Sequence, residues 1–428
     1  MNVARGLLGI VVLVGIAWLL SSNRRRFPWK LVVVGLALQW ALAWLVLGTD
    51  TGRAIFDVIG SMVTVVLRGA DQGAAFVFGP LAGAHPAVSW SAVAGIKIMT
   101  TIIVVAMLSA IGYHYGILQR VVTSLAWVMK RTLGVSGAES LSGAANVFLG
   151  QTEAPLLVRP YIASMTESEL MAMMTGGFAT VALGVMAVYV SLLGGGDQAM
   201  EVAVARHLLT ACLMSAPAAF VMAKVMVPET KTPVTADAIK LDMECKTSSL
   251  VDAAASGASQ GMKLAINVLA MLIAFIALIA IIDAALIFVG KWSLLAPVVA
   301  AMGLEQLDLT GLLGLLFSPV AWLIGVETGD CRELAGLLGK AMATNELIAY
   351  ESLGEMAANH TLSPRSVTLA TYSLCGFANV SSIGIQIGGI GALVPERRAD
   401  LVRLGPRAML GGAMACWTTG CIAGVLVQ

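Results

Sequence analysis

Charged residues are scarce in this chain of 428 residues. Lys and Arg number 26 and Asp and Glu 25, together 12% of the sequence, whereas a soluble domain carries about 25%. Because 58% of the residues are hydrophobic, too little polar surface remains to cover a water-soluble globule of this size. The composition therefore predicts a polytopic membrane protein.

Strong net charge, abundant aromatic residues and paired cysteine motifs are missing as well, and each absence argues against a class of protein. The formal net charge is only +1, which argues against a nucleic-acid partner. Aromatic residues make up 6% of the chain and no strand-like alternation is present, so we expect spanning helices and no outer-membrane barrel. The six cysteines show no CxxC spacing, so neither a disulfide framework nor a zinc site is expected. An intramembrane enzyme is disfavoured because no HExxH motif is present.

Six apolar runs are each about as long as a bilayer-crossing helix, which takes ~20 residues. They lie at 6–22, 29–48, 94–113, 207–227, 264–289 and 408–427. The basic cluster Arg24 to Arg26 follows the first run, so we expect a retained helix there and no cleaved signal. By the positive-inside rule this cluster and the basic loop from Arg397 to Arg407 are cytoplasmic, which places both termini in the periplasm.

Two further segments predict amphipathic helices at the membrane interface. The first has apolar residues at helical spacing, namely Ile55, Val58, Ile59, Met62, Val63 and Val66. The second carries Val122, Leu125, Ala126 and Met129 with basic residues at its ends. An ordinary packing role is the alternative for the second helix. The charge-rich residues 228–263 predict a solvated connection.

Two apolar regions, 133–193 and 309–393, are interrupted by polar residues, glycine and proline. Backbone that is not helical at membrane depth must be satisfied by protein, water or a ligand, so we expect function there. A break that carries a carboxylate is followed by Gly-Phe-Ala-Thr-Val at 177–181 in the first region and by Gly-Phe-Ala-Asn-Val at 376–380 in the second. This order indicates an internal duplication, and interrupted helices in related repeats point to a transporter's binding site.

The carboxylates in these breaks are Glu153 and Glu346. An intramembrane carboxylate costs about 2.5 to 3.5 kcal/mol on insertion scales, so each needs cations, protons or hydrogen-bond donors. The alternative to a functional role is that each carboxylate forms a structural ion pair with a basic side chain, for example with Arg159. The polar neighbours in the motifs are neutral, namely Gln151, Thr152, Asn345, Asn379, Ser381 and Ser382. They suit a neutral solute rich in hydroxyl and amide groups, on whose ring Phe377 can stack.

A cation site is indicated beside the first break. Asn146 and Thr180 can each supply a side-chain oxygen, and hard cations take oxygen ligands. Free carbonyls at half-helix ends are where coupling Na+ binds in such transporters. On these residues alone, a helix-capping role remains the alternative.

Taken together, the motifs resemble the concentrative nucleoside transporter family. The resemblance rests on Gly150 to Leu156, Met174 to Ala179, Val227 to Thr230, Asp252 to Ala254, Ala265 to Val268, Asn345-Glu346 before Ala349-Tyr350, and Cys375 to Asn379 with Ser381-Ser382. It implies an all-α polytopic membrane protein with eight spanning helices, two re-entrant hairpins and interfacial helices, arranged as an inverted internal repeat. It also implies a homotrimer in a lipid bilayer.

The resemblance implies a division into scaffold and transport domains. Residues 1–117 hold the N-terminal spans, an interfacial helix and the third span, mainly scaffold, and 207–307 hold the central spans and connecting loop. The transport domain comprises 118–206 and 308–395, each with a hairpin and a broken helix, and 396–428 form the last spanning helix.

The resemblance also assigns roles to single residues. Gln151, Thr152 and Glu153 match contacts to the nucleobase, and Val185 and Phe377 line the base. Glu346, Asn379 and Ser382 match contacts to the ribose. The Na+ site comprises the side chains of Asn146 and Thr180 with the carbonyls of Leu149 and Val181.

The expected function is sodium-driven import of nucleosides such as uridine, cytidine or adenosine across a bacterial inner membrane, by an elevator-like movement. A proton-coupled symporter of the same fold, using Glu153 or Glu346, is the alternative. A passive channel is disfavoured, because paired broken helices around a small polar site favour occlusion. The preference for purine or pyrimidine, the ion stoichiometry and the resting conformation stay open.

Overall fold

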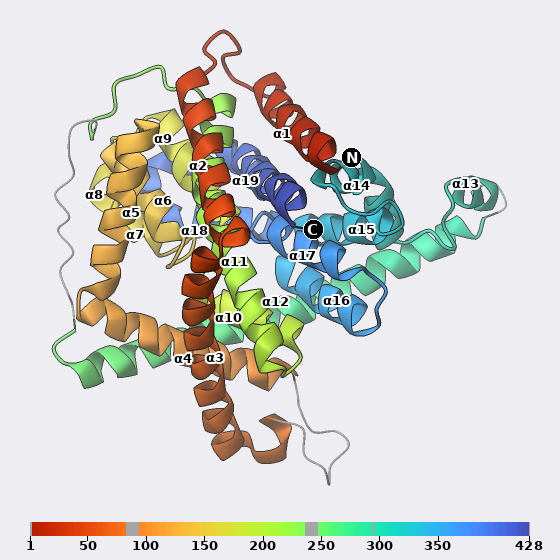
Figure 1. Cartoon of the computed structure of the whole chain (residues 1–428), viewed down its shortest axis with the longest axis horizontal. Helices are drawn as coiled ribbons and strands as arrows, with labels where there is room; N and C mark the ends of the chain where they lie inside the picture. Colours follow the sequence, from red (N-terminus) through yellow and green to blue (C-terminus); the bar gives the residue numbers. More distant parts are fainter. Residues whose placement is uncertain (1, 83–93, 236–246, 293–294, 428) are drawn as a thin grey trace.

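The computed structural model describes residues 2–82, 94–235, 247–292 and 295–427, and its regular structure there is entirely helical. The helices are α1 (Asn2–Leu19), α2 (Trp29–Gly48), α3 (Asp50–Phe78), α4 (Ala94–His114), α5 (Ile117–Leu133), α6 (Gly137–Asn146), α7 (Ala154–Leu157), α8 (Arg159–Ile162), α9 (Glu167–Ala179), α10 (Leu183–Gly194), α11 (Gln198–Met226), α12 (Leu250–Gly290), α13 (Ala296–Ala301), α14 (Leu309–Ile324), α15 (Cys331–Ala343), α16 (Glu346–Ala358), α17 (Pro364–Ser373), α18 (Val380–Leu393) and α19 (Arg398–Leu426). Two short 3-10 helices, η1 (Gly79–Ala82) and η2 (Pro395–Arg397), complete the set. Figure 1 shows their arrangement.

Eight crossings of a membrane fit the described helices. Six segments are long and apolar enough, namely α2, α4, α9 with α10, α11, α12 and α19. The shorter apolar helix α1, and the apolar helix α18 together with α17, are consistent with the other two. The apolar helix α14 has only 16 residues and packs on α15. The all-helical fold that the sequence predicts is confirmed.

Four helices, namely α1, α11, α12 and α19, begin earlier than their apolar runs, so the predicted bounds are wrong there. α11 begins at Gln198, where the Asp197 side chain accepts from a backbone N–H, and α12 begins at Leu250 under a Ser249 cap. Polar caps and first turns extend a helix beyond its apolar window. The predicted connection 228–263 is therefore helical from Leu250 on, and its residues 236–246 lie outside the described part. The predicted basic loop is mostly the start of α19, which begins at Arg398.

The same order of elements occurs twice along the chain. A long helix, a helix that packs on the hairpin, a hairpin, a broken helix and a final spanning helix form α4 to α11, and the same series forms α12 to α19. The first Gly-Phe-Ala motif ends α9, and the second lies in the break between α17 and α18. Figure 1 shows the first hairpin (α6 to α8) and the second hairpin (α15 and α16) on opposite sides of the view, with α11 between them. This arrangement is consistent with the predicted duplication.

The long helix α12 packs closely along α4, and both run across the lower half of Figure 1. Small side chains on α12 allow this close approach to α4. They recur every four residues, at Ala253, Gly257, Gly261 and Ala265. A Cβ on Gly257 would lie 2.8 Å from the carbonyl oxygen of Ala106. Such small-residue stripes let membrane helices approach backbone to backbone.

Residues 257–261 of α12 fit the pattern GxSxG, which in hydrolases marks a nucleophilic serine on a sharp turn between a strand and a helix. Here they lie inside a helix, where no such nucleophile elbow forms.

The two predicted amphipathic helices are α3 and α5. Their apolar stripes, that is, the apolar residues at helical spacing, have different surroundings. In α3 the stripe residues Ile55, Val58 and Met62 are exposed, and the small Gly60 meets the backbone of α11 at Val202. The N-terminal part of this apolar stripe is therefore open to lipid or to another subunit, whereas Val63 and Val66 pack against the core. In α5 the opposite holds, since Val122 and Met129 are buried. That burial supports the packing alternative for α5, which packs on α6.

Candidate substrate-binding site

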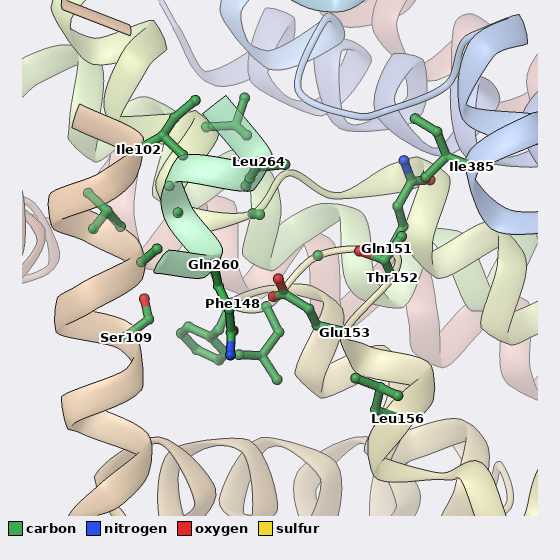
Figure 2. A pocket seen from close by; sticks show the side chains of 18 of the residues that line it. Ile102, Ser109, Phe148, Gln151, Thr152, Glu153, Leu156, Gln260, Leu264 and Ile385 are labelled. Carbon is green, nitrogen blue, oxygen red and sulfur yellow. The ribbon is translucent and has the colours of Figure 1, made fainter. Parts of the chain in front are cut away.

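One cavity of about 1410 Å³ lies between the two halves of the chain. All eight predicted substrate contacts line it: Gln151, Thr152, Glu153, Val185, Glu346, Phe377, Asn379 and Ser382. Polar side chains of α12, among them Gln260 and Asn267, line the same cavity. Figure 2 shows Gln151, Thr152 and Glu153 on the tip loop of the first hairpin, with Gln260 and Leu264 of α12 nearby.

The tip of the first hairpin is a sharp turn. Gly150 has φ +94°, and even the Cβ of an alanine there would come within 2.9 Å of the Ala182 side chain, so this turn requires glycine. Pro155 lies in the first turn of α7, where no amide donor is lost. Glu153 precedes that helix without capping it, so its carboxylate stays available to the cavity.

Glu153 is exposed toward the cavity, whereas its apolar flanks in the sequence predict a buried carboxylate. The tip that follows the Gly150 turn lines the cavity, and this open space explains the difference. Arg159 lines the same cavity, yet no ion pair joins it to Glu153 among the described residues. The pairing alternative is therefore not realised in this structure.

Glu346 occupies the matching place at the tip of the second hairpin, as the first residue of α16. Only 3% of the residue is exposed. The Tyr189 hydroxyl donates to Oε1 across 2.9 Å, and Asn379 Nδ2 donates to Oε2 across 2.6 Å. Two neutral donors thus compensate the buried carboxylate, and each oxygen keeps a lone pair for a further donor.

Asn379 positions the start of α18. Its Oδ1 accepts from the Ser382 backbone N–H across 2.8 Å and from the Ser381 hydroxyl across 2.6 Å. Its amide nitrogen is therefore directed at Glu346. Ser382 Oγ in turn accepts from Gln151 Nε2 across 3.1 Å. Through these bonds the tip of one hairpin meets the broken helix of the other repeat.

The predicted sodium ligands lie beside the cavity, at the break between α9 and α10. Asn146 ends α6 and is 1% exposed, and neither of its side-chain polar atoms has a hydrogen-bond partner in the described chain. The Thr180 hydroxyl lies 3.1 Å from the Asn146 carbonyl oxygen and 2.9 Å from that of Gly176. The capping alternative therefore fits Thr180 in part, but it does not fit Asn146.

The other two predicted ligands contribute carbonyl groups. Leu149 lies at the hairpin turn and lines the cavity, and the Val181 carbonyl faces the thiol of Cys212, with the sulfur 3.7 Å away. A buried, unpaired amide oxygen next to a hydroxyl and unwound carbonyls is the donor set that a hard monovalent cation takes. These residues fit Na+.

Sequence reasoning missed two residues that hold the site together. Gln386 donates to Gln151 Oε1 across 3.0 Å, and it lies one helical turn after Ser382, a spacing that could have revealed it. Tyr189 lies in an uninterrupted apolar run of α10, so nothing in the sequence distinguishes it from core.

An all-helical membrane chain with two hairpin tips and two broken helices around one polar cavity defines a secondary transporter. Three family profiles match: "Na+ dependent nucleoside transporter C-terminus" over residues 207–424, its N-terminal counterpart over 8–81, and "Nucleoside recognition" over 95–196. The chain belongs to the Na+-dependent nucleoside transporter family. It is therefore a nucleoside transporter and not an enzyme.

Relatives and solved structures agree with this family. An uncharacterised transporter of Haemophilus influenzae is 40% identical over 100% of this chain and 98% of its own. Human solute carrier family 28 member 3 is 35% identical over 98% of this chain and 59% of its own length. The structure of CNTnw in an inward-facing substrate-bound state matches with a TM-score of 0.89 at 35% identity, covering all of both chains. A substituted CNTnw in an outward-facing state matches with a TM-score of 0.88 at 35% identity, over 100% of this chain and 98% of that one.

Proposed function

We propose that this chain imports nucleosides across a bacterial inner membrane in symport with Na+. The observation that carries the proposal is that both hairpin tips bring a carboxylate to the same cavity. Glu346 is buried and accepts hydrogen bonds from two neutral donors. Neither carboxylate forms an ion pair in the described chain. A ribose offers hydroxyl donors to such a carboxylate, and a base offers donor and acceptor pairs to an amide and a hydroxyl.

In this proposal the first hairpin tip binds the base of the nucleoside and the second hairpin tip binds its ribose. Gln151, Thr152 and Glu153 contact the base, and Val185 and Phe377 form its apolar walls. Glu346, Asn379 and Ser382 bind the ribose. The bond from Gln151 to Ser382 places the two sets next to each other, as a base and its sugar require.

Sodium binding at Asn146 and Thr180, with the carbonyls of Leu149 and Val181, would order the start of the first hairpin tip. The unpaired buried amide of Asn146 supports this assignment, because such a group is costly unless a ligand satisfies it. An ion that favours the substrate-competent tip raises nucleoside affinity, and the nucleoside must raise ion affinity by the same factor.

Proton coupling is the second candidate, and one observation favours it. Glu153 faces the cavity, and no side chain of the described chain donates a hydrogen bond to its carboxylate, so a proton can neutralise it during transport. Glu346 suits this role less well, because both of its oxygens already accept from donors.

The movement we propose is an elevator-like shift of 118–206 and 308–395 against a scaffold within a homotrimer. CNTnw in an inward-facing state and a substituted CNTnw in an outward-facing state support alternating access. The exposed apolar residues Ile55, Val58 and Met62 of α3 suit a subunit contact. Both termini would face the periplasm. The contact of Gly6 with Val425 brings the chain ends together, in agreement with a common side.

Calorimetric titration of the purified protein with uridine, in NaCl and in choline chloride at one pH, tests the coupling. Sodium is expected to tighten uridine binding at least tenfold, and uridine to tighten sodium binding by the same factor. Equal affinity in both salts contradicts sodium coupling. If uridine does not bind, the titration is repeated with cytidine and adenosine, and no binding of any of the three in either salt contradicts the substrate assignment.

A further inference from the structure

Gln386 lies behind the wall of the cavity, on α18, with only 1% of its surface exposed. Its amide nitrogen makes two hydrogen bonds. One goes to the backbone carbonyl of Met174 in α9 across 3.1 Å, and the other to Oε1 of Gln151 across 3.0 Å. Gln386 therefore connects α18, α9 and the tip of the first hairpin at one point.

The Met174 carbonyl sets the direction of both glutamine amides. A carbonyl oxygen only accepts, so Gln386 must turn its nitrogen toward it. The same NH₂ group carries a second proton, and Gln151 must then present its oxygen to that proton. Gln151 Nε2 consequently faces the other way, where Ser382 Oγ lies 3.1 Å away. An amide orientation is assigned from its hydrogen-bond network, and here a fixed backbone group anchors the network.

Close packing keeps this arrangement in place. A Cβ on Gly177 would lie 2.8 Å from Gln386 Nε2 and 2.9 Å from the Cβ of Gln151, so α9 passes directly against both side chains. Turning either amide over would leave buried acceptors unpaired, which is unfavourable. On its oxygen side Gln386 has no hydrogen-bond partner in the described chain, so nothing there favours the opposite orientation.

We propose that Gln386 is a positioning residue that fixes Gln151 as a hydrogen-bond donor toward the base. Gln151 has one N–H bond to Ser382 and one N–H left, while its oxygen is engaged by Gln386. The base side of the site then selects a base that places an acceptor, such as a carbonyl oxygen, where Gln151 reaches. This inference rests on the proposed function, in which Gln151 contacts the base.

Two substitutions separate orientation from packing. In Gln386→Glu the carboxylate only accepts, so Gln151 is expected to turn over, give its nitrogen to that carboxylate and offer its oxygen to the base. Gln386→Met keeps the side-chain length and removes both bonds. Gln39→Met is the matched control, because Gln39 is also fully buried and donates to a backbone carbonyl, that of Met214, across 3.1 Å, away from the cavity.

The readout is KM and maximal uptake rate for uridine against cytidine and for inosine against adenosine, since each pair exchanges a carbonyl for an amino group on the base edge. Gln386→Glu is expected to shift the KM ratio of at least one pair about tenfold toward the amino-bearing base, with a smaller change in maximal rate. Gln386→Met is expected to bring that ratio close to one, and this variant carries the test if Gln386→Glu does not assemble. Gln39→Met is expected to keep both ratios of the unsubstituted protein.

Two outcomes overturn the inference, and they are distinguishable. If Gln151→Ala changes the ratios while the Gln386 variants leave them within twofold, Gln151 contacts the base but Gln386 does not orient it. If Gln151→Ala itself retains the KM values and ratios of the unsubstituted protein, the base contact of the proposed function fails as well.

Discussion

The Tyr189 hydroxyl donates to Glu346 Oε1 across 2.9 Å, and the two residues come from opposite repeats. Tyr189 is completely buried, and its ring stacks on that of Tyr350 with the centroids 4.1 Å apart. The carboxylate that we assign to the ribose is thus held from α10 by a rigid side chain. Orientation of Glu346 therefore depends on a residue outside the second hairpin.

Removing that hydroxyl should weaken substrate binding. A hydrogen bond to a charged group contributes about 1.5–3 kcal/mol, so Tyr189→Phe is expected to raise the KM for uridine by about 10- to 100-fold. The matched control is Tyr350→Phe, which keeps the ring stack and loses only a bond to the Thr371 carbonyl. Equal KM values for the two variants would show that the Tyr189 hydroxyl does not position Glu346.

Replacing the carboxylate itself should be more severe. In the unsubstituted protein the Tyr189 hydroxyl and the Asn379 amide each donate to one carboxylate oxygen. In Glu346→Gln an NH₂ group replaces one of these two acceptor oxygens, so one of the two hydrogen bonds is lost. Radiolabelled uridine uptake is expected to fall to the background of empty vesicles. The control Glu355→Gln lies on the exposed side of the same helix and should retain uptake. Full uptake by Glu346→Gln contradicts the ribose assignment.

The sodium site makes a separate prediction. Asn146→Ala removes a side-chain oxygen that has no protein partner in the described chain, so the sodium concentration for half-maximal uptake is expected to rise at least tenfold. Ser142→Ala, one turn earlier on α6, also removes a buried unpaired oxygen and serves as the control. An unchanged sodium response in Asn146→Ala argues that Na+ binds elsewhere.

The contact between α4 and α12 predicts a change in stability. In Gly257→Ala the new Cβ would lie 2.6 Å from that of Ala110 and 2.8 Å from the Ala106 carbonyl oxygen, and overpacking of this kind costs about 1–3 kcal/mol. A Cβ on Gly112 in α4 meets no atom within 4 Å, so Gly112→Ala should not destabilise the protein. Thermal unfolding in detergent is expected to give a lower Tm for Gly257→Ala only. A Tm unchanged by both variants would show that α12 moves aside at no cost.

The sequence predicts the elements that depend on local chemistry. Apolar runs predict the spanning helices, and the polar breaks with Glu153 and Glu346 predict the two tips, because a carboxylate and non-helical backbone in an apolar region both need an explanation. The eight residues expected from the family resemblance line one cavity. Helix starts are less well predicted, since the polar first turns of α11, α12 and α19 do not stand out from loops.

The remaining features depend on contacts between distant segments. Tyr189 looks like any core residue of an apolar helix until α16 is placed against α10. The role of Gln386 depends on a carbonyl of α9 that no sequence pattern marks. Likewise, the exposure of Glu153 depends on the cavity that distant segments form beside the tip. The apolar stripes of α3 and α5 look alike in the sequence, although Val122 and Met129 of α5 are buried and Ile55 and Met62 of α3 are exposed.

Uptake of radiolabelled uridine into proteoliposomes tests the central claim most directly. With an inward sodium gradient and equal pH on both sides, uridine is expected to accumulate above its external concentration, and collapse of the sodium gradient should end accumulation. With a pH gradient and no sodium, uridine should not accumulate. Accumulation driven by the pH gradient alone, and indifferent to sodium, would contradict sodium symport and favour a proton carried by Glu153.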